Sequence, residues 1–495
     1  MSASPADEAD VIVIGGGLAG LAAAHYITTA GLTAIVLEAA PRCGGRCRQF
    51  ELDGVVVEEG CEFLHGSTCT AKRLADAIGL PTERVFTAAH GDGGPDDAPA
   101  PDGSTAFYHV DGQTLPFDSP LLTPLNDAID RLSELTLSES DSRSVADYLR
   151  DEGVTSAGLL RLAAASYSNT LGVGDALDSL PLRAVVDLER RWHEADGDGD
   201  FRVAAHEGPG QPASLRRLCD ELAQHATVHV NSVVTRVQLG DPARGRGDGG
   251  GAGGGGGRTH GGGGAVRVAC SDGRWVRGAA AIVALPVTAL QQGAPAFAPP
   301  LPPSKRAALA SIRMLPALKL LLLLASPPWR AGGAPPPRVH ALITAGAPGA
   351  VVPEMWFRRL RDGRWLASGF ATGGYASALT ARGEAAAVAL ALAQLARALP
   401  GEVDGAAALR ARLVAARLVD WSACAHVRGG YSAPSFAEHR DARAVYRRAE
   451  WDGRLGFAGE ASEEAMMTMS AAIDSGRRAA RQVAEAIQAG GRSRL

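Results

Sequence analysis

A glycine-rich turn between an apolar run and a helix-like stretch places the strongest limit on how this chain can fold. Residues 11–14 (VIVI) are typical of a buried parallel strand. Gly15, Gly17 and Gly20 follow with the spacing G-x-G-x-x-G. The first glycine permits a tight turn, the second lets the backbone approach a pyrophosphate, and the third allows close packing of helix on strand. The pattern predicts the first strand, turn and helix of a Rossmann-like unit.

A second apolar run, residues 33–37, ends in Glu38, which is placed to accept hydrogen bonds from ribose hydroxyls. The residues between the two runs, from 18 to about 29, read as a helix. Its N-terminus would point at the phosphates, where free N–H groups and the helix dipole favour negative charge. We therefore expect the chain to bind the ADP half of a dinucleotide.

A second glycine pair, Gly44 and Gly45, lies between Arg42 and Arg46 soon after Glu38. Glycines allow close backbone approach, and either arginine offers planar donors to phosphate oxygens. A surface turn with solvated arginines is the alternative. Because this glycine pair comes soon after Glu38, it favours FAD over NAD. We therefore add Arg42, Gly45 and Arg46 to the predicted cofactor-binding residues.

Further motifs of one known family recur in order along most of the chain. They are residues 38–46 (EAAPRCGGR), 58–66 (EEGCEFLHG), 228–237 (VHVNSVVTRV), 282–303, 318–325 (LKLLLLLA), 421–434 (WSACAHVRGGYSAP) and 455–462 (LGFAGEAS). On these motifs the chain resembles the flavin-containing amine oxidases, a group that includes polyamine oxidases, monoamine oxidases and lysine-specific histone demethylases. Within this group it is most similar to polyamine oxidases of the peroxisomal type.

The resemblance implies an α/β fold with two α+β domains. A Rossmann-like FAD-binding domain of the glutathione-reductase type, at 1–85, 205–303 and 450–495, would be interleaved with a substrate domain of mixed sheet plus helices, at 86–204 and 304–449. Residues 240–264 are mostly glycine and predict a disordered insert. The FAD is expected to be non-covalent, because the segment Arg428-Gly429-Gly430-Tyr431 has no cysteine where monoamine oxidases tether their flavin.

Lys319 and His65 are the predicted catalytic residues. Lys319 lies in an apolar run, where a buried ammonium needs a partner for its charge, and the matching lysine of the family holds a water near flavin N5. The alternative is a strand-end lysine that reaches solvent. His65, in F-L-H-G, resembles a polyamine oxidase motif and could accept a hydrogen bond from an ammonium or help keep the reacting nitrogen neutral. A structural histidine is the alternative.

The predicted substrate-binding residues are His65, Glu62, Trp421 and Tyr431. Glu62 would make an acidic contact, and Tyr431 an aromatic wall that attracts the amine by a cation–π interaction. Trp421 matches the same family motif as Tyr431, and either aromatic residue could instead be ordinary core.

Three further cofactor-binding predictions rest on the resemblance. Glu460 matches the family acid that binds FAD, with a solvated carboxylate as the alternative. Val234 matches a position whose backbone contacts adenine, although an apolar strand residue is normally core. Thr468 would open a closing helix whose dipole stabilises the reduced flavin.

The chain departs from the family between residues 460 and 472. Ala465 stands where the family usually has a second aromatic residue facing the flavin, and Met467 and Ala471 stand where it has glycines. These differences predict a wider amine pocket, or one filled by soft methionine side chains. Glu59 is a smaller departure, because the family usually has a small or apolar residue there.

Composition narrows the partners. The net charge of −5 offers no basic surface for nucleic acid. No run reaches the ~18 apolar residues of a membrane span. The seven cysteines are scattered without metal-ligand spacing, so we expect free thiols and no metal site.

The chain finishes in Ser493-Arg494-Leu495, a variant of the S-K-L peroxisomal address. This tail predicts recognition by a peroxisomal import receptor and a peroxisomal location, with the cytoplasm as the alternative. The acidic, polar N-terminus is unlike a signal peptide.

The most specific prediction is an FAD-dependent polyamine oxidase. It would oxidise secondary amines of the spermine and spermidine type with O2, giving an aldehyde, a shorter amine and H2O2. The alternatives are a lysine-demethylase-like or other amine oxidase, and an FAD-binding protein without oxidase activity.

Overall fold

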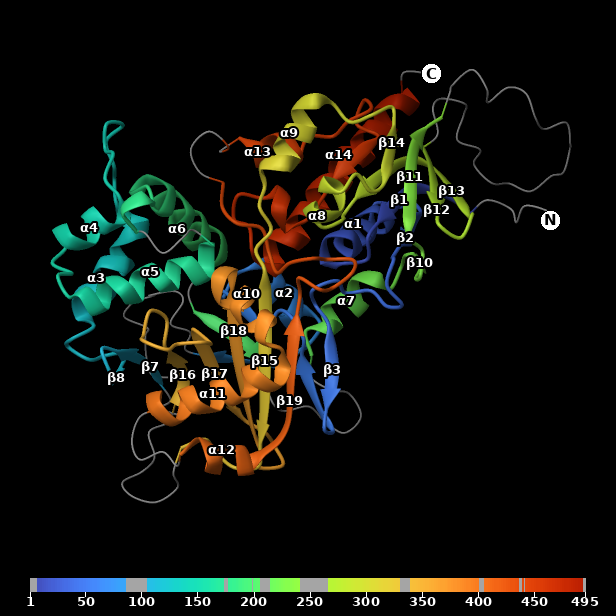
Figure 1. Cartoon of the computed structure of the whole chain (residues 1–495). Helices are drawn as coiled ribbons and strands as arrows, with labels where there is room; N and C mark the ends of the chain where they lie inside the picture. The colour runs from blue at the N-terminus through green and yellow to red at the C-terminus, as the bar shows by residue number, and fades with distance from the viewer. Residues whose placement is uncertain are drawn as a thin grey trace, which may run out of the picture. The chain divides into compact units, whose positions relative to one another are not determined.

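The chain forms two compact units in a computed structural model (Figure 1). Unit 1 is assembled from Met1–Cys47, Arg216–Arg313 and Pro434–Leu495, and unit 2 from Arg48–Leu215 and Met314–Ala433. The structure describes residues 7–85, 105–172, 177–197, 199–204, 214–240, 266–329, 339–399, 405–435, 439 and 441–492. The predicted glycine-rich insert and the C-terminal tripeptide lie outside these residues, except for Gly240.

The sheet of unit 1 has eight strands. In sheet order they are β10 (Thr227–His229), β2 (Ala34–Leu37), β1 (Asp7–Ile14), β13 (Trp275–Val283), β12 (Val266–Cys270), β11 (Val234–Leu239) and β14 (Ala296–Ala298), with β20 (Leu455–Phe457) paired to β13. The strands β10, β2, β1, β13 and β20 pair in parallel, whereas β12 runs antiparallel to both of its neighbours. The continuous apolar runs of β1 (residues 11–14) and β2 are those expected of parallel strands buried on both faces.

Two of the helices of unit 1 pack closely against each other. The helices of this unit are α1 (Leu18–Thr29), α7 (Arg216–Ala223), α8 (Val287–Gln291), α9 (Pro303–Ser311), α13 (Ala442–Tyr446) and α14 (Met469–Arg492). Helix α1 packs on β1, β2 and β13 and also against α14. A Cβ atom on Gly476 of α14 would lie 2.1 Å from the Ala19 carbonyl oxygen of α1. A glycine is therefore required at this crossing.

The large sheet of unit 2 has seven strands. In sheet order they are β19 (Leu413–Asp420), β15 (Ala317–Leu324), β18 (Trp365–Thr372), β17 (Glu354–Arg359), β16 (Val339–Ile343), β7 (Thr105–Val110) and β8 (Gln113–Pro116). Two small sheets accompany it. One is the hairpin of β3 (Gln49–Leu52) and β4 (Val55–Glu58), and the other joins β5 (Phe63–His65), β9 (Asp200–Val203) and β6 (Thr82–Val85).

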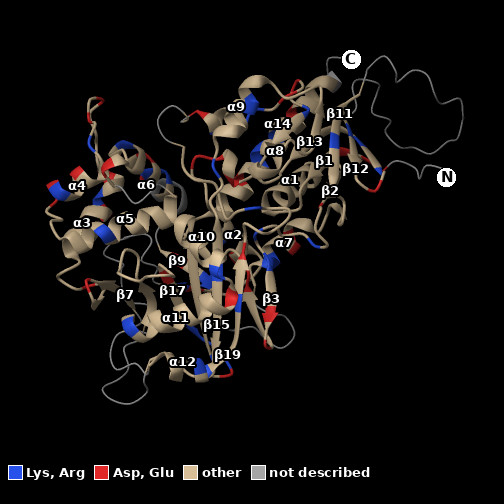
Figure 2. Cartoon of the chain, in the orientation of Figure 1, with Lys and Arg blue, Asp and Glu red and all other residues tan. Residues whose placement is uncertain are grey.

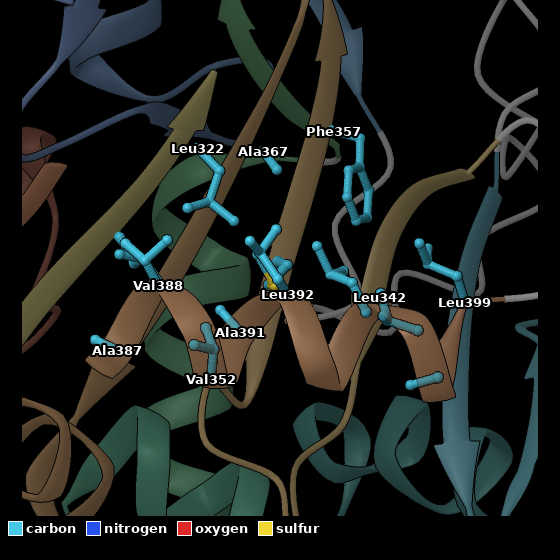
Figure 3. Packing of buried hydrophobic residues seen from close by; sticks show 14 of the residues in the cluster. Leu322, Leu342, Val352, Phe357, Ala367, Ala387, Val388, Ala391, Leu392 and Leu399 are labelled. Carbon is cyan, nitrogen blue, oxygen red and sulfur yellow. The ribbon is translucent and has the colours of Figure 1, made fainter. Parts of the chain in front are cut away.

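Helices cover one face of the large sheet. Helix α11 (Glu384–Ala398) lays Ala387, Val388, Ala391 and Leu392 on apolar side chains of β15, β16, β17 and β18 (Figure 3). The other helices of unit 2 are α2 (Thr70–Ala77), α3 (Thr123–Asp130), α4 (Val145–Asp151), α5 (Ala157–Leu171), α6 (Leu182–Asp196), α10 (Gly373–Arg382) and α12 (Ala406–Arg412). Leu321 and Leu323 on the opposite face of β15 pack with the β3–β4 hairpin. Both faces of β15 are thus covered, which explains its unbroken leucine run.

The predicted α/β class is confirmed, but the domain boundaries differ. Residues 48–85 were assigned to the FAD domain from the sequence, whereas the structure places them in unit 2. The reason is tertiary pairing: Leu52 and Val57 join a core with β15, and β5 and β6 both pair with β9. The remaining boundaries, predicted at 205, 304 and 450, lie at 216, 314 and 434.

No single helix of the described chain has the length and apolarity to cross a bilayer. Helices α10 and α11 have that length and apolarity only when they are taken together, and the pair is bent by 119°. No group of three metal-ligating side chains occurs among the described residues, and all seven cysteines are free thiols. Figure 2 shows acidic and basic residues interspersed over the helices and strands.

Candidate functional site

The glycine turn of unit 1 joins β1 to α1 as the sequence predicts. Gly15 has a φ of +105°, and a Cβ on Gly20 would lie 1.9 Å from the Gly15 carbonyl oxygen. Both positions therefore require glycine. The N-cap of α1 is Gly17, which has no side chain to occupy the first N–H groups of the helix. The turn presents the type of helix N-terminus that binds phosphate.

Glu38 is almost fully buried at the end of β2, with 8% of its surface exposed. Its carboxylate accepts hydrogen bonds from the Gly16 N–H at 2.6 Å and the Ala40 N–H at 2.8 Å. These bonds fix the acid against the glycine turn. A carboxylate has further lone pairs, so these bonds are compatible with the predicted contact to ribose hydroxyls.

The second glycine pair packs directly on the first. The Gly44 N–H donates to the Gly16 carbonyl oxygen at 2.8 Å. Gly45 has a φ of +57°, and a Cβ there would lie 3.3 Å from the Gly17 Cα. The structure thus brings two predicted glycine segments together through their backbones. The neighbouring Arg42 is exposed.

Glu460 links distant parts of unit 1. Its side chain is buried, and it forms an ion pair with Arg46 at 2.8 Å. Its other carboxylate oxygen accepts the Met467 N–H at 3.3 Å. The structure therefore joins two residues that the sequence predicts to bind the cofactor, although 414 positions separate them.

The remaining cofactor predictions occupy the ends of two elements. Thr468 precedes α14, and its hydroxyl accepts the Ala471 N–H at 3.0 Å, which caps the helix. Val234 begins β11 opposite Cys270. Met467 has a φ of +77°, a backbone conformation that favours glycine, the residue that the resembling family has there.

Lys319 in unit 2 is held by three oxygen atoms. It lies on β15 with 4% of its surface exposed. Its ammonium donates to the carbonyl oxygens of Glu58 and Gly60, both at 3.1 Å, and forms an ion pair with Glu62 at 2.5 Å. An ammonium has three N–H donors, and these contacts match that number. The structure thus brings together two predicted residues, Lys319 and Glu62, as partners of each other.

The two carboxyls beside Lys319 differ in acidity. Burial raises the pKa of Glu62, but the charge and hydrogen bond of Lys319, together with the charges of Arg202 and Arg358, outweigh burial and leave the pKa below its usual range. Burial raises the pKa of Glu58 to about 7, against the opposing effects of the Leu215 N–H and Lys319. Glu62 is therefore the ionised partner of Lys319.

Aromatic rings form a continuous row in unit 2. Successive ring centroids along the row lie 6.3, 4.9, 6.1 and 6.3 Å apart. In order, the row consists of His65, Phe63, Trp356, Phe370 and Tyr431. The predicted residues His65 and Tyr431 are therefore the two ends of one row. The Tyr431 hydroxyl donates to the Thr170 carbonyl oxygen at 2.9 Å.

Trp421 has the contacts of a core residue. It is 4% exposed, and its indole N–H donates to the Glu59 carbonyl oxygen at 3.1 Å. The Arg48 guanidinium lies 4.6 Å from the centre of its ring and pairs with Glu59 at 2.8 Å. These contacts favour the alternative reading of Trp421 as core, and they explain the unusual acidic residue at position 59.

Two acidic residues that the sequence did not single out lie close to the predicted ones. Asp200 pairs with His65 at 2.7 Å. Glu354 of β17 lies opposite Phe370 of β18. Glu354 is buried and hydrogen bonded to Asn169 at 3.2 Å, and burial raises its pKa to about 7. No motif marks either acid, because each gains its role from strand pairing across the fold. Glu354 stands out only as a buried acidic residue directly before the apolar residues 355–357 of β17.

The glycine turn, the buried acid after β2 and the parallel strands define a dinucleotide-binding α/β protein. The chain belongs to the flavin-containing amine oxidoreductase family, whose model matches residues 18–484. The family resemblance drawn from the motifs is thereby confirmed. FAD is the cofactor, and the glycine turn that a Cβ would fill, together with Glu38, fits its ADP half.

Known proteins similar to the chain include amine oxidases. It is 37% identical over 86 residues to putrescine oxidase of Kocuria rosea, covering 17% of this chain and 18% of that protein. It is 31% identical over 115 residues to flavin-containing amine oxidase B of Homo sapiens, covering 23% and 19%. The matched segments thus span less than a fifth of either relative.

Two solved structures share the fold over nearly the whole chain. One is a putrescine oxidase bound to putrescine, with 20% identity, coverage of 97% of this chain and 100% of that chain, and a TM-score of 0.72. The other is a cyclohexylamine oxidase from Brevibacterium oxydans, with 20% identity, coverage of 97% and 99%, and a TM-score of 0.71. At this level of identity the likeness establishes the fold.

Proposed function

We propose that this protein is an FAD-dependent amine oxidase. The observation that carries the proposal is one face of the large sheet of unit 2. Lys319 pairs with Phe370, and Phe370 pairs with Glu354, so the three side chains lie on the same face. Trp356, two residues after Glu354, shares that face. Aromatic rings and carboxylates both attract ammonium groups.

The residues of unit 1 would hold the cofactor. Gly15, Gly17 and Gly20 would receive the pyrophosphate, and Glu38 the ribose. Hydride acceptance from the carbon next to the amine nitrogen is the chemistry that FAD supplies when bound. The protein's own residues would bind the amine, orient it and exclude water. With O2 as the electron acceptor and water to hydrolyse the oxidised amine, the proposed products are an aldehyde, a shorter amine and H2O2.

We propose polyamines of the spermine and spermidine type as the more specific substrates. Such molecules carry several ammonium groups, and unit 2 offers more than one acidic partner. The pKa of about 7 lets Glu354 ionise when a cation arrives. His65, at one end of the aromatic row, would receive the reacting nitrogen.

Anaerobic titration of the purified holoenzyme tests both levels of the proposal. Spermine or spermidine should bleach the flavin absorbance, and air should restore it. Bleaching by a simple monoamine alone would keep the amine oxidase and remove the polyamine proposal. Bleaching only by a methylated lysine peptide would point to a demethylase-like enzyme. A flavin that no amine reduces would contradict the proposal and favour a protein without oxidase activity.

We also propose that the protein acts in the peroxisome. The support is the tail Ser493-Arg494-Leu495, and an enzyme that releases H2O2 suits that organelle. A fluorescent protein fused to the N-terminus of the full chain should colocalise with a peroxisomal marker. The same fusion without the last three residues should be cytoplasmic. Identical cytoplasmic distributions of the two fusions would contradict the proposal.

A further inference from the structure

We propose that Asp200 is a positioning residue for His65, which it holds so that the imidazole Nε2 accepts a proton from the amine substrate. The part concerning the substrate rests on the proposed function. The positioning part concerns only the geometry of two side chains in unit 2, and it can be tested separately.

Strand pairing places Asp200 beside His65. The two residues are direct partners in the antiparallel pair of β5 and β9, so their side chains lie on the same face. The Gly66 N–H donates to the Gly199 carbonyl oxygen at 2.7 Å and continues the pairing past His65. The Asp200 Oδ1 lies 2.7 Å from the His65 Nδ1. This distance is therefore set by the strand register.

The two side chains differ in exposure. The side chain of Asp200 is 5% exposed, whereas that of His65 is 33% exposed. A buried carboxylate behind a partly exposed imidazole is the arrangement expected when an acid orients a base.

The bond to Asp200 selects one tautomer of His65. An ionised carboxylate only accepts hydrogen bonds, so the His65 Nδ1 carries the hydrogen and donates it. The lone pair of the neutral imidazole is then on Nε2. The adjacent anion also stabilises the imidazolium that forms when Nε2 takes a proton. Asp200 thus determines that Nε2 is the His65 nitrogen that accepts the proton, and it makes Nε2 a stronger base.

The proposed step is one proton transfer. A substrate ammonium gives its proton to the His65 Nε2, which leaves a neutral amine with a free electron pair and an imidazolium. Asp200 stays ionised, and nothing is oxidised or reduced in this step. The neutral amine is the form from which hydride can subsequently leave.

Three cationic groups lie near the dyad, and two of them form ion pairs with other acids. Arg202 of β9 pairs with Glu83 of β6 at 2.7 Å. Lys72 of α2 pairs with Asp76 at 2.6 Å. Arg84 of β6 has its guanidinium beside Gly199. Asp200 is in direct contact with His65, so its removal is the sharpest test.

The first test reads the tautomer without any turnover. In protein labelled with 15N-histidine, the His65 signals, assigned by their loss in His65→Gln, should show a protonated Nδ1 at high pH. Asp200→Asn should abolish this preference. A His65 that keeps the same tautomer in Asp200→Asn would overturn the proposal. This readout stands even if no amine reduces the flavin.

The second test is a double-mutant cycle with the holoenzyme. Asp200→Asn should lower kcat/KM about 10- to 100-fold and move the acidic limb of its pH profile to lower pH, because the imidazolium loses its neighbouring anion. In the His65→Gln background the same change should cost little more. Equal losses in both backgrounds would show a structural role and overturn the proposal. Asp10→Asn, at a buried acid of unit 1 bonded to Thr33, controls for general destabilisation.

Discussion

At the scale of single residues, Lys319 shows how the fold supplies a charge with partners. Its strand is buried on both faces, so its ammonium is satisfied by Glu62 and two carbonyl oxygens. The resemblance assigns the matching lysine to a water near the flavin. In this chain Glu62 contacts the ammonium directly, and the two residues form an ion pair.

Replacing Glu62 with glutamine should leave the buried ammonium of Lys319 without an anion. We expect the free energy of unfolding to fall by about 3 kcal/mol, measured by urea denaturation. Because the pKa of Glu62 is lowered in the fold, its contribution is present above its unfolded pKa and is lost as the pH falls through its folded pKa. Glu51→Gln, at an exposed glutamate of β3, should change the free energy of unfolding little. Equal effects of the two substitutions would contradict the expectation.

Glu354 predicts the opposite dependence on pH. Its pKa is raised to about 7 by burial, so the folded state binds more protons than the unfolded state between about pH 4.5 and 7. Stability from this group therefore falls as the pH rises through that range. The neutral substitution Glu354→Gln should remove the fall, and its stability relative to the natural protein should rise from pH 5 to pH 8. A difference independent of pH would show that Glu354 ionises normally.

Met467 occupies a left-handed backbone conformation with a φ of +77°. Met467→Gly should relieve the strain and raise the free energy of unfolding by about 0.5–1 kcal/mol. Met467→Ala keeps the Cβ and should give no such gain. The comparison is made by chemical denaturation of both variants. A gain for alanine as large as that for glycine would mean that the backbone is unstrained.

At the scale of secondary-structure elements, β15 and α11 define the core of unit 2. The leucines of β15 alternate between α11 on one face and the β3–β4 hairpin on the other. The same alternation places Lys319 on the face opposite to α11. A strand built to be buried thereby positions the one polar side chain that it carries.

Leu392 of α11 lies at the centre of this packing (Figure 3). Leu392→Ala should lower the free energy of unfolding by about 2–5 kcal/mol, because the cavity adds to the lost burial. Val414→Ala on β19, at a side chain 44% exposed, should cost less than about 0.5 kcal/mol. Thermal unfolding of both variants gives the comparison. Similar losses would show that α11 packs loosely on the sheet.

At the scale of the whole molecule, FAD binding depends on chain segments that are far apart in the sequence. Gly20→Ala would place a Cβ 1.9 Å from a carbonyl oxygen of the glycine turn. The purified variant should contain several-fold less flavin, measured by its absorbance, and a lower Tm that added FAD partly restores. Gly405→Ala, where a Cβ would meet nothing within 4 Å, is the matched control. Normal flavin content in Gly20→Ala would contradict this role of the turn.

Acid precipitation tests how that flavin is attached. All of it should appear in the supernatant, since the segment at 428–431 lacks a cysteine. Flavin that remains with the precipitated protein would show a covalent bond.

The sequence by itself determined the cofactor and the family. The glycine turn, Glu38 and the second glycine pair are local signals, because backbone geometry and charge at adjacent positions carry the chemistry. The ordered motifs extended that inference along the chain. Lys319 also stood out, as a charge within an apolar strand.

Only the tertiary structure decided which side chains are partners. The pairs Lys319 with Glu62, His65 with Asp200, and Arg46 with Glu460 depend on strand register and helix packing between distant segments. The same pairing moved residues 48–85 into unit 2 and placed Glu354 on the face of Lys319. Local patterns specify conformation and burial, whereas the choice of partner is a long-range property of the folded chain.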